Sequence, residues 1–166
     1  MQEQGKGLPP LIAIVGPTAV GKTRFSIAMA ERFGGEIVSA DSRQIYIYMD
    51  IGTAKPSASQ RASVPHHLID IAYPDEVFTL AQYQARAYQA VEDITRRGRV
   101  PFLVGGTGLY VRAVLEGFAI PSVPPDPELR RRLERKAAEE GGAALHARLA
   151  RLEPQAAAAI DRRNVR

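Results

Sequence analysis

The sequence predicts an α/β fold in which a parallel sheet is flanked by helices, and two observations support this prediction. Three short, largely apolar runs, at 11–15, 37–40 and 100–104, alternate with segments of helical spacing or irregular composition, and 66–70 is a further candidate strand. Such runs are typical of strands buried in a parallel sheet. The second observation is the stretch GPTAVGKT, which follows the first run and fits G-x-x-x-x-G-K-[ST], the pattern of a phosphate-binding loop.

The predicted helices have recognisable ends. Glycines close the helices expected at 23–33 and 109–116, because glycine readily adopts the left-handed conformation that follows a helix. Thr79 begins a capping-box pattern that opens a further amphipathic helix, and Gly98 stops it. Residues 49–63 show no such periodicity and are predicted to be irregular.

A proline-rich linker divides the chain. Four prolines lie within residues 120–127, so we place a phosphate-loop core domain at 1–120 and a helical segment at 121–166. Three helices are expected in the segment: 128–140, 143–152 and 154–160. The last of them is followed closely by the end of the chain, and we expect the sequence to be a piece of a longer protein that is interrupted at its C-terminal end.

Composition excludes several classes of protein. The chain has 166 residues and no cysteine, which excludes disulfides and thiolate metal sites. It has neither an apolar leader nor a run near the ~20 residues that span a bilayer. We therefore expect a soluble, cytoplasmic protein that does not enter a membrane, and nothing in the sequence demands more than a monomer.

The positive charge is concentrated near the C-terminus. The net charge is +4; residues 1–120 hold 12 Lys or Arg against 11 Asp or Glu, whereas residues 121–166 hold 10 against 7. Such a basic segment is either a solvated helix face or a surface that meets a polyanion. The sequence alone leaves both interpretations open.

The phosphate loop is predicted to bind a phosphorylated ligand. It consists of Gly16, Pro17, Thr18, Ala19, Val20, Gly21, Lys22 and Thr23. Its glycines allow backbone N–H groups to point inward, and the helix that follows adds partial positive charge. Lys22 can reach the outer phosphates, and Thr23 can be a ligand of Mg²⁺.

Taken alone, the loop suggests ATP, but an ATP hydrolase would need further residues. Its Mg²⁺ is usually held also by an acid after a second strand, and here the run 100–104 is followed by two glycines. Asp41, after another predicted strand, is either a general base or a loop cap. Thr107, on the same rim of the predicted sheet, is either a functional hydroxyl or a helix cap. The adjacent His66 and His67 would face opposite ways on a strand and are interpreted as structural.

Several stretches together resemble the tRNA dimethylallyltransferase family, whose members are also called tRNA isopentenyltransferases. They are GPTAVGKT, DSRQIYIYMDIGTAKPS, HHLIDIAYPDEVFT and LVGGTGLYVRAVLEG. Their order and spacing match across nearly all of 11–117, and the resemblance continues more weakly through 126–130. The combination of the DSRQ, GTAKP and GGTGLY blocks is far more specific than the phosphate loop alone.

The resemblance implies the transfer of a dimethylallyl group from dimethylallyl diphosphate to N6 of adenosine 37 in tRNA. The loop would then hold the diphosphate with Mg²⁺, and Lys22 would stabilise the leaving group. Asp41 corresponds to the proposed general base, and Thr107 to a position near the reacting groups. The residues implied to contact tRNA are Asp41, Ser42, Arg43, Gln44, Thr107, Arg130 and Arg166.

Three alternatives remain at this point. An adenylate isopentenyltransferase would prenylate free AMP, ADP or ATP, although the basic segment favours tRNA. A kinase with the same loop would transfer phosphate. A tRNA-binding module without catalysis would need neither Lys22 nor Asp41. Because family members are about twice as long, we expect weak or no activity from a chain that ends at Arg166.

Overall fold

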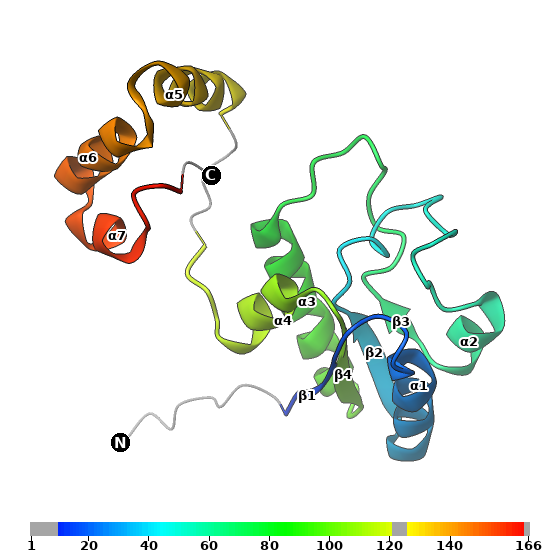
Figure 1. Cartoon of the computed structure of the whole chain (residues 1–166). Coiled ribbons are helices and arrows are strands. Elements are labelled where there is room, and N and C mark those ends of the chain that lie inside the picture. Colours follow the sequence, from blue (N-terminus) through cyan, green and yellow to red (C-terminus); the bar gives the residue numbers. More distant parts are fainter. Residues whose placement is uncertain (1–9, 121–125, 165–166) are drawn as a thin grey trace, which may run out of the picture. The chain divides into compact units, whose positions relative to one another are not determined.

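The computed structural model describes residues 10–120 and 126–164. It forms two compact units, Met1–Pro121 and Ser122–Arg166. The first unit is built around a sheet of four parallel strands in the order β1-β4-β2-β3 (Figure 1). The strands are β1 (Ile12–Val15), β2 (Gly35–Ser39), β3 (His66–His67) and β4 (Val100–Gly105). The predicted α/β fold with a parallel sheet is confirmed.

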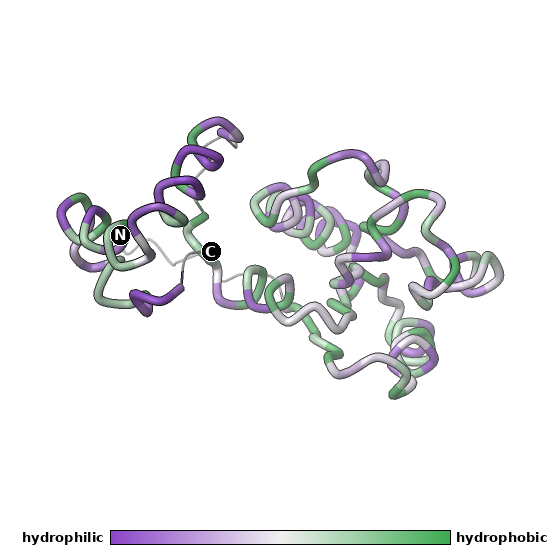
Figure 2. Tube along the Cα trace, turned by 45° about the horizontal axis from the view of Figure 1, so that its top comes forward, coloured by the Kyte–Doolittle hydropathy of each residue, from purple (hydrophilic) through white to green (hydrophobic). Residues whose placement is uncertain are grey.

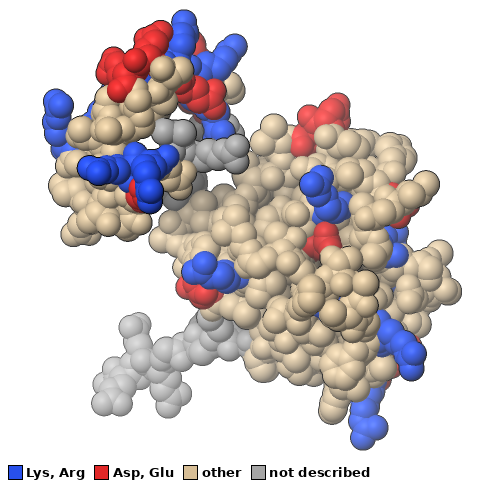
Figure 3. Space-filling model, viewed as in Figure 1, with Lys and Arg blue, Asp and Glu red and all other residues tan. Residues whose placement is uncertain are grey.

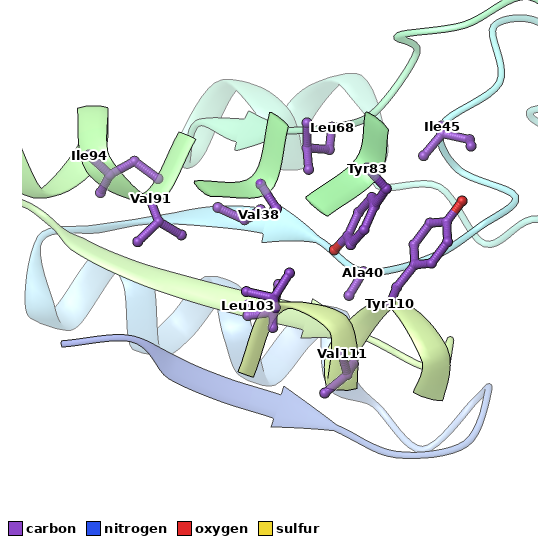
Figure 4. Close-up of a cluster of buried hydrophobic side chains, with 12 residues drawn as sticks. Val38, Ala40, Ile45, Leu68, Tyr83, Val91, Ile94, Leu103, Tyr110 and Val111 are labelled. Atoms are coloured by element: carbon purple, nitrogen blue, oxygen red, sulfur yellow. The ribbon is translucent and has the colours of Figure 1, made fainter. Parts of the chain in front are cut away.

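Helices cover both faces of this sheet. They are α1 (Lys22–Phe33), α2 (Ala58–Ser63), α3 (Leu80–Arg96) and α4 (Gly108–Leu115). Successive strand residues point to opposite faces, so Val38 and Leu103 pack with α3 and α4 (Figure 4). Ile37 and Phe102 pack on the other face with Ala30 of α1. The apolar runs of the sequence therefore supply two cores, one for each layer of helices.

Predicted helix ends agree with the structure in most places. The Thr79 side chain accepts a hydrogen bond from the Gln82 N–H, and the Gln82 side chain binds the Thr79 N–H, which completes the capping box of α3. Gly34, with φ 61°, ends α1 in the left-handed conformation. The prediction that 49–63 is wholly irregular is wrong, because α2 occupies its end. Ser57 and Gln60 form a second capping box there, a signal that was present in the sequence.

Two strands differ from the prediction. The run 66–70 forms a strand only at His66–His67, because Leu68 and Asp70 have φ values of 62° and 56°, which cannot continue an extended chain. β1 was expected to be buried, but within residues 10–120 and 126–164 it lies at the edge of the sheet and pairs only with β4. Its Ile12 and Val15 are accordingly 44% and 55% exposed.

The second unit is helical. It contains α5 (Pro127–Glu140), α6 (Gly142–Leu152) and α7 (Pro154–Ala159). Asp126 caps α5 by accepting hydrogen bonds from two backbone N–H groups, with Pro127 in the first turn, as the sequence predicted. His146 Nε2 lies 2.9 Å from the Ala157 carbonyl oxygen and so links α6 to α7. Hydrophilic and hydrophobic residues alternate along these helices (Figure 2), as expected for helices with one packed face.

A buried carboxylate joins the strands at the amino-terminal edge of the sheet. Glu36 of β2 is 2% exposed and accepts hydrogen bonds from both terminal nitrogens of Arg97. His67 Nε2 lies 2.7 Å from Glu36 Oε2, and Arg99 is a more distant ion partner. The hydrogen bonds from Arg97, helped by His67, lower the pKa of Glu36 to about 2 against the opposing effect of burial. This cluster is therefore a stabilising ionic network.

We predict that Glu36→Gln destabilises the protein by about 2 kcal/mol at pH 7, because two arginines lose their buried counter-ion. A carboxylate with a lowered pKa in the folded state stabilises the protein above its unfolded pKa of about 4.5. The difference between wild type and variant should therefore shrink as the pH falls from 4.5 toward 2. Urea unfolding at several pH values measures this difference in the free energy of unfolding.

Glu92→Gln is the matched control, since Glu92 is an exposed residue of α3. It should change the free energy of unfolding by no more than about 0.5 kcal/mol. An equal loss for the two variants at pH 7 would contradict the assigned role of Glu36.

Candidate functional site

The phosphate loop lies between β1 and the start of α1. Gly21, with φ 88°, is the residue before the helix, and α1 begins at Lys22. The first backbone N–H groups of a helix have no partner within the helix and carry partial positive charge. The Lys22 ammonium donates a hydrogen bond to the Pro17 carbonyl oxygen at 2.6 Å, which holds it against its own loop. The loop thus has the geometry of an anion-binding turn.

Asp41 lies where the chain leaves β2. Its Oδ1 accepts hydrogen bonds from the backbone N–H groups of Arg43, at 2.8 Å, and Gln44, at 3.4 Å. Asp41 therefore caps the turn, in agreement with its interpretation as a loop cap. Among the described residues, none makes a hydrogen bond or ion pair with Oδ2, and Asp41 also lines a cavity beside the phosphate loop. One oxygen thus fixes the side chain, and the other is left without a hydrogen bond in the described part of the chain.

Thr107 connects two loops of the site. It precedes α4, but its side chain makes no helix-capping hydrogen bond. Instead its Oγ1 accepts a hydrogen bond from the Ser42 N–H at 2.9 Å and donates one to the Ser42 hydroxyl at 3.3 Å. The Thr107 N–H also binds the Ala40 carbonyl oxygen. The threonine therefore holds the turn that carries Asp41, and the interpretation of its hydroxyl as a helix cap is wrong.

Two glycines allow this close arrangement. A Cβ at Gly105 would lie 2.1 Å from the Ala40 carbonyl oxygen, which is far inside contact distance. A Cβ at Gly106 would lie 3.1 Å from the Gly16 carbonyl oxygen and 3.8 Å from Lys22 Nζ. The end of β4 therefore touches both the exit of β2 and the phosphate loop, so that the three segments meet at the carboxyl edge of the sheet, where α/β folds bind ligands.

A cavity of about 330 Å³ opens between these segments. Its polar wall includes Lys22, Thr23 and Asp41, and its apolar wall includes Ile37 and Val104. Further polar lining residues, which sequence reasoning missed, are Ser26, Ser39, Gln60 and His66. Ser26 could have been found, since it is four residues after Lys22 on one face of a helix. The others enter only through the tertiary fold.

His66 presents a hydrogen-bond acceptor at this cavity. Its Nδ1 is 2.7 Å from the Val64 carbonyl oxygen, which can only accept, so Nδ1 carries the proton. Burial lowers the pKa of His66, with a smaller opposing effect of the Val64 hydrogen bond. The ring is therefore neutral near pH 7 and leaves Nε2 as an acceptor. His67 contacts Glu36 instead, so the two histidines have different partners, as expected for neighbouring strand residues that face opposite ways.

Other predicted residues lie in different settings. Ser42 is held by Thr107, and Arg43 is exposed. The Gln44 carboxamide is engaged within the protein. Arg130 is exposed on α5 of the second unit, where basic and acidic side chains are interspersed (Figure 3). Arg166 lies outside the described residues.

The residues present fit a Mg²⁺ ion that is held mainly by a phosphorylated ligand. Within 10–120 and 126–164 no group of three or more His, Cys, Asp or Glu residues could hold a metal ion. Mg²⁺ commonly takes one or two protein ligands and completes its shell with phosphate oxygens and water. The Thr23 hydroxyl lines the cavity and is a suitable oxygen donor for such an ion.

The model of the IPP transferase family matches residues 44–166. The chain belongs to the IPP transferase family. It is 64% identical to tRNA dimethylallyltransferase of Roseiflexus sp. (strain RS-1) over 157 residues, which cover 95% of this chain and 52% of that protein. The corresponding enzyme of Chloroflexus aggregans is 64% identical over 156 residues, 94% of this chain and 53% of that protein. The chain thus spans about half the length of the curated relatives it matches.

Solved structures of IPP transferases are also similar. The tRNA isopentenylpyrophosphate transferase of Bacillus halodurans is 50% identical with a TM-score of 0.67, over 95% of this chain and 52% of that one. A eukaryotic dimethylallyltransferase that acts on tRNA is 26% identical with a TM-score of 0.77, over 93% and 38%. The family resemblance inferred from the motifs is therefore confirmed. No helix within the described ranges has both the length and the apolarity to cross a membrane.

We predict that Gly105→Ala destabilises the protein by about 3 kcal/mol or more, because a methyl group would overlap the Ala40 backbone. Gly108→Ala is the control. A Cβ at Gly108 meets nothing within 4 Å, and alanine favours a helix, so stability should stay equal or rise by up to about 1 kcal/mol. Thermal and urea unfolding compare the two. Similar stabilities for both variants would contradict the close contact at Ala40.

Proposed function

We propose that the whole protein transfers a dimethylallyl group from dimethylallyl diphosphate to N6 of adenosine 37 in tRNA and releases diphosphate. We further propose that it acts as a monomer. The observation that carries this proposal is the shared cavity, in which a phosphate-binding loop, the Asp41 carboxylate and apolar side chains meet. Membership of the IPP transferase family supports the same reaction.

The phosphate loop would stabilise the leaving group. Breaking the allylic C–O bond leaves negative charge on diphosphate, and fixed donors lower the barrier by stabilising that charge. Lys22 and the N–H groups at the start of α1 provide such donors, and Thr23 provides a hydroxyl. A bound Mg²⁺ would supply additional charge neutralisation. The loop would thus promote departure of diphosphate, and no phosphoryl group would be transferred.

Asp41 would accept the proton from the nucleophile. The N6 lone pair forms the C–N bond to the allylic carbon while the C–O bond to diphosphate breaks, and N6 then carries an excess proton. The unengaged Oδ2 of Asp41 can take it, because Oδ1 is held by two backbone N–H groups. The neutral His66 on the cavity wall adds an acceptor without repelling a cationic carbon.

Recognition of tRNA would require both units. To reach the cavity, the adenine must leave its stack, as in other enzymes that modify bases. We assign contacts with the flipped nucleotide to Ser42 and Arg43, and contacts with the anticodon stem-loop to Arg130 and Arg166. The N-cap of α5 at Asp126 supports this assignment indirectly, because it orders the helix on which Arg130 is exposed.

The test offers labelled dimethylallyl diphosphate to the full-length protein with tRNA, AMP or ATP as the acceptor. We expect label in tRNA alone. Asp41→Ala should lower the rate of transfer by about 10²–10⁴-fold, the usual contribution of a general base, while tRNA binding measured by filter retention stays within a few-fold. Transfer to AMP and not to tRNA would indicate an adenylate isopentenyltransferase, and phosphate transfer from ATP would indicate a kinase.

We predict that Thr107→Val lowers the rate of transfer by about 10–100-fold, because the Ser42 N–H loses its acceptor and the turn that carries Asp41 loosens. Thr107→Ser keeps the hydroxyl and should stay within about 3-fold of the wild type. Single-turnover assays measure both rates. Equal losses in the two variants would argue against a role for the hydroxyl.

A further inference from the structure

A buried lysine lies at the centre of the GTAKP block. The Lys55 side chain is only 3% exposed. Its ammonium donates to Asp50 Oδ1 at 2.8 Å, to Asp70 Oδ1 at 2.6 Å and to the Tyr46 carbonyl oxygen at 2.7 Å. An ammonium has three donors, so all of them are engaged. Lys55 therefore has neither the exposure nor a free donor with which to bind a phosphate or a nucleic acid.

Arg61 extends this ion cluster. Its NH1 binds Asp70 Oδ2 at 2.6 Å, and its Nε donates to the Pro56 carbonyl oxygen at 3.2 Å. Both oxygens of Asp70 are thus engaged by cations. Burial raises the pKa of Asp70, but the hydrogen bonds and charges of Lys55 and Arg61 together outweigh it and lower that pKa. The cluster joins three separate stretches of chain: 46–50, 55–61 and Asp70.

The loop that Lys55 anchors holds Gln44. The Gln44 Nε2 group donates to the carbonyl oxygens of Thr53, at 3.2 Å, and Ala54, at 3.1 Å. Its Oε1 accepts a hydrogen bond from the Ser39 hydroxyl at 3.1 Å. All the polar groups of this carboxamide are therefore used inside the protein. The glutamine connects the end of β2 to the two residues that precede Lys55.

Gln44 in turn contacts Asp41. The Gln44 backbone N–H is 3.4 Å from Asp41 Oδ1. The Gln44 carbonyl oxygen accepts a hydrogen bond from the Asp70 N–H at 3.1 Å. Asp70 therefore restrains this backbone directly, and it also restrains the loop through Lys55. Two routes of hydrogen bonds therefore begin in one ion cluster and end at Gln44. Its backbone N–H is one of the two that bind the Asp41 carboxylate, the other being that of Arg43.

Backbone strain lies in the segments that this cluster joins. Tyr48, Ala54 and Asp70 have φ values of 66°, 51° and 56°. Residues other than glycine rarely adopt such values, which persist only where surrounding contacts impose them. The hydrogen bonds of Lys55 and Gln44 are such contacts. If they were lost, these segments would relax toward ordinary backbone conformations, and the turn that carries Asp41 would shift with them.

We propose that Lys55 is a positioning residue, which sets the orientation of the Asp41 carboxylate through the loop 50–55 and Gln44. Gln44 then acts as the internal connector in this path, through its carboxamide. The catalytic consequence rests on the proposed role of Asp41, whereas the path of contacts does not.

Lys55→Met tests this proposal in the full-length protein, because methionine keeps most of the side chain and removes the charge. We expect kcat to fall about 10–100-fold, the effect of misplacing a catalytic group by about 1 Å. KM for dimethylallyl diphosphate and Kd for tRNA should stay within about 3-fold. Amide hydrogen exchange across 41–47 should become faster. Arg96→Met, which breaks an exposed ion pair with Asp93 on α3, should leave all four quantities unchanged.

Gln44→Ala is the second variant, because it breaks the path without disturbing the ion cluster. It tests the proposal even if Lys55→Met does not fold. It should lower kcat by a similar factor. The double variant should lose little more than either single one, because both changes interrupt one path. Independent losses would multiply, and they would overturn the proposal.

Other outcomes are equally decisive. A normal kcat together with normal amide exchange in Lys55→Met would overturn the proposal. Weaker tRNA binding with an unchanged kcat would also overturn it, because that result is expected if Lys55 binds nucleic acid. If the wild type transferred no dimethylallyl group, the proposed function would fail. The exchange rates across 41–47 would still decide whether Lys55 restrains the turn.

Discussion

The contact between Ala40 and the end of β4 is the constraint on which the site depends. The Ala40 N–H binds the Val104 carbonyl oxygen, and the Ala40 carbonyl oxygen accepts the Thr107 N–H. Gly105 leaves no room for a side chain beside it. Because Ala40 is held on both sides, the next residue, Asp41, begins its turn at a defined point beside the phosphate loop. A wider separation of β2 and β4 would separate the carboxylate from the anion-binding helix terminus.

The amino-terminal and carboxyl edges of the sheet differ in the groups they carry. At the amino-terminal edge, Glu36 gathers Arg97 and His67 around a buried charge and contributes stability. At the carboxyl edge, the chain exposes N–H groups, a lysine and a carboxylate to the cavity. In the core between these two edges, the rings of Tyr83 and Tyr110 stack with their centroids 3.8 Å apart. The Tyr83 hydroxyl donates a hydrogen bond to the Ser39 carbonyl oxygen. A rigid core thus directly supports the strand end that carries Asp41.

Sequence reasoning located the candidate reactive groups better than the groups that hold them in place. Lys22, Asp41 and Thr107 follow predicted strands, and parallel strands bring their carboxyl ends to one edge. The contacts of the Gln44 carboxamide with Ser39, Thr53 and Ala54 were not predicted. The role of Lys55 was not predicted, because its partner Asp70 is 15 residues away and pairs of this kind leave no periodic signal.

The sequence by itself determined the fold class, the phosphate loop, most helix ends and the family, because each follows from local patterns: apolar runs, capping residues, glycines and contiguous motifs. Only the tertiary structure decided that β1 lies at the edge of the sheet formed by the described residues, that the strand at His66 stops after His67, and that the Thr107 hydroxyl holds Ser42 instead of capping its helix. These features depend on contacts between segments distant in sequence, whose hydrogen bonds and left-handed backbone conformations arise when the chain packs.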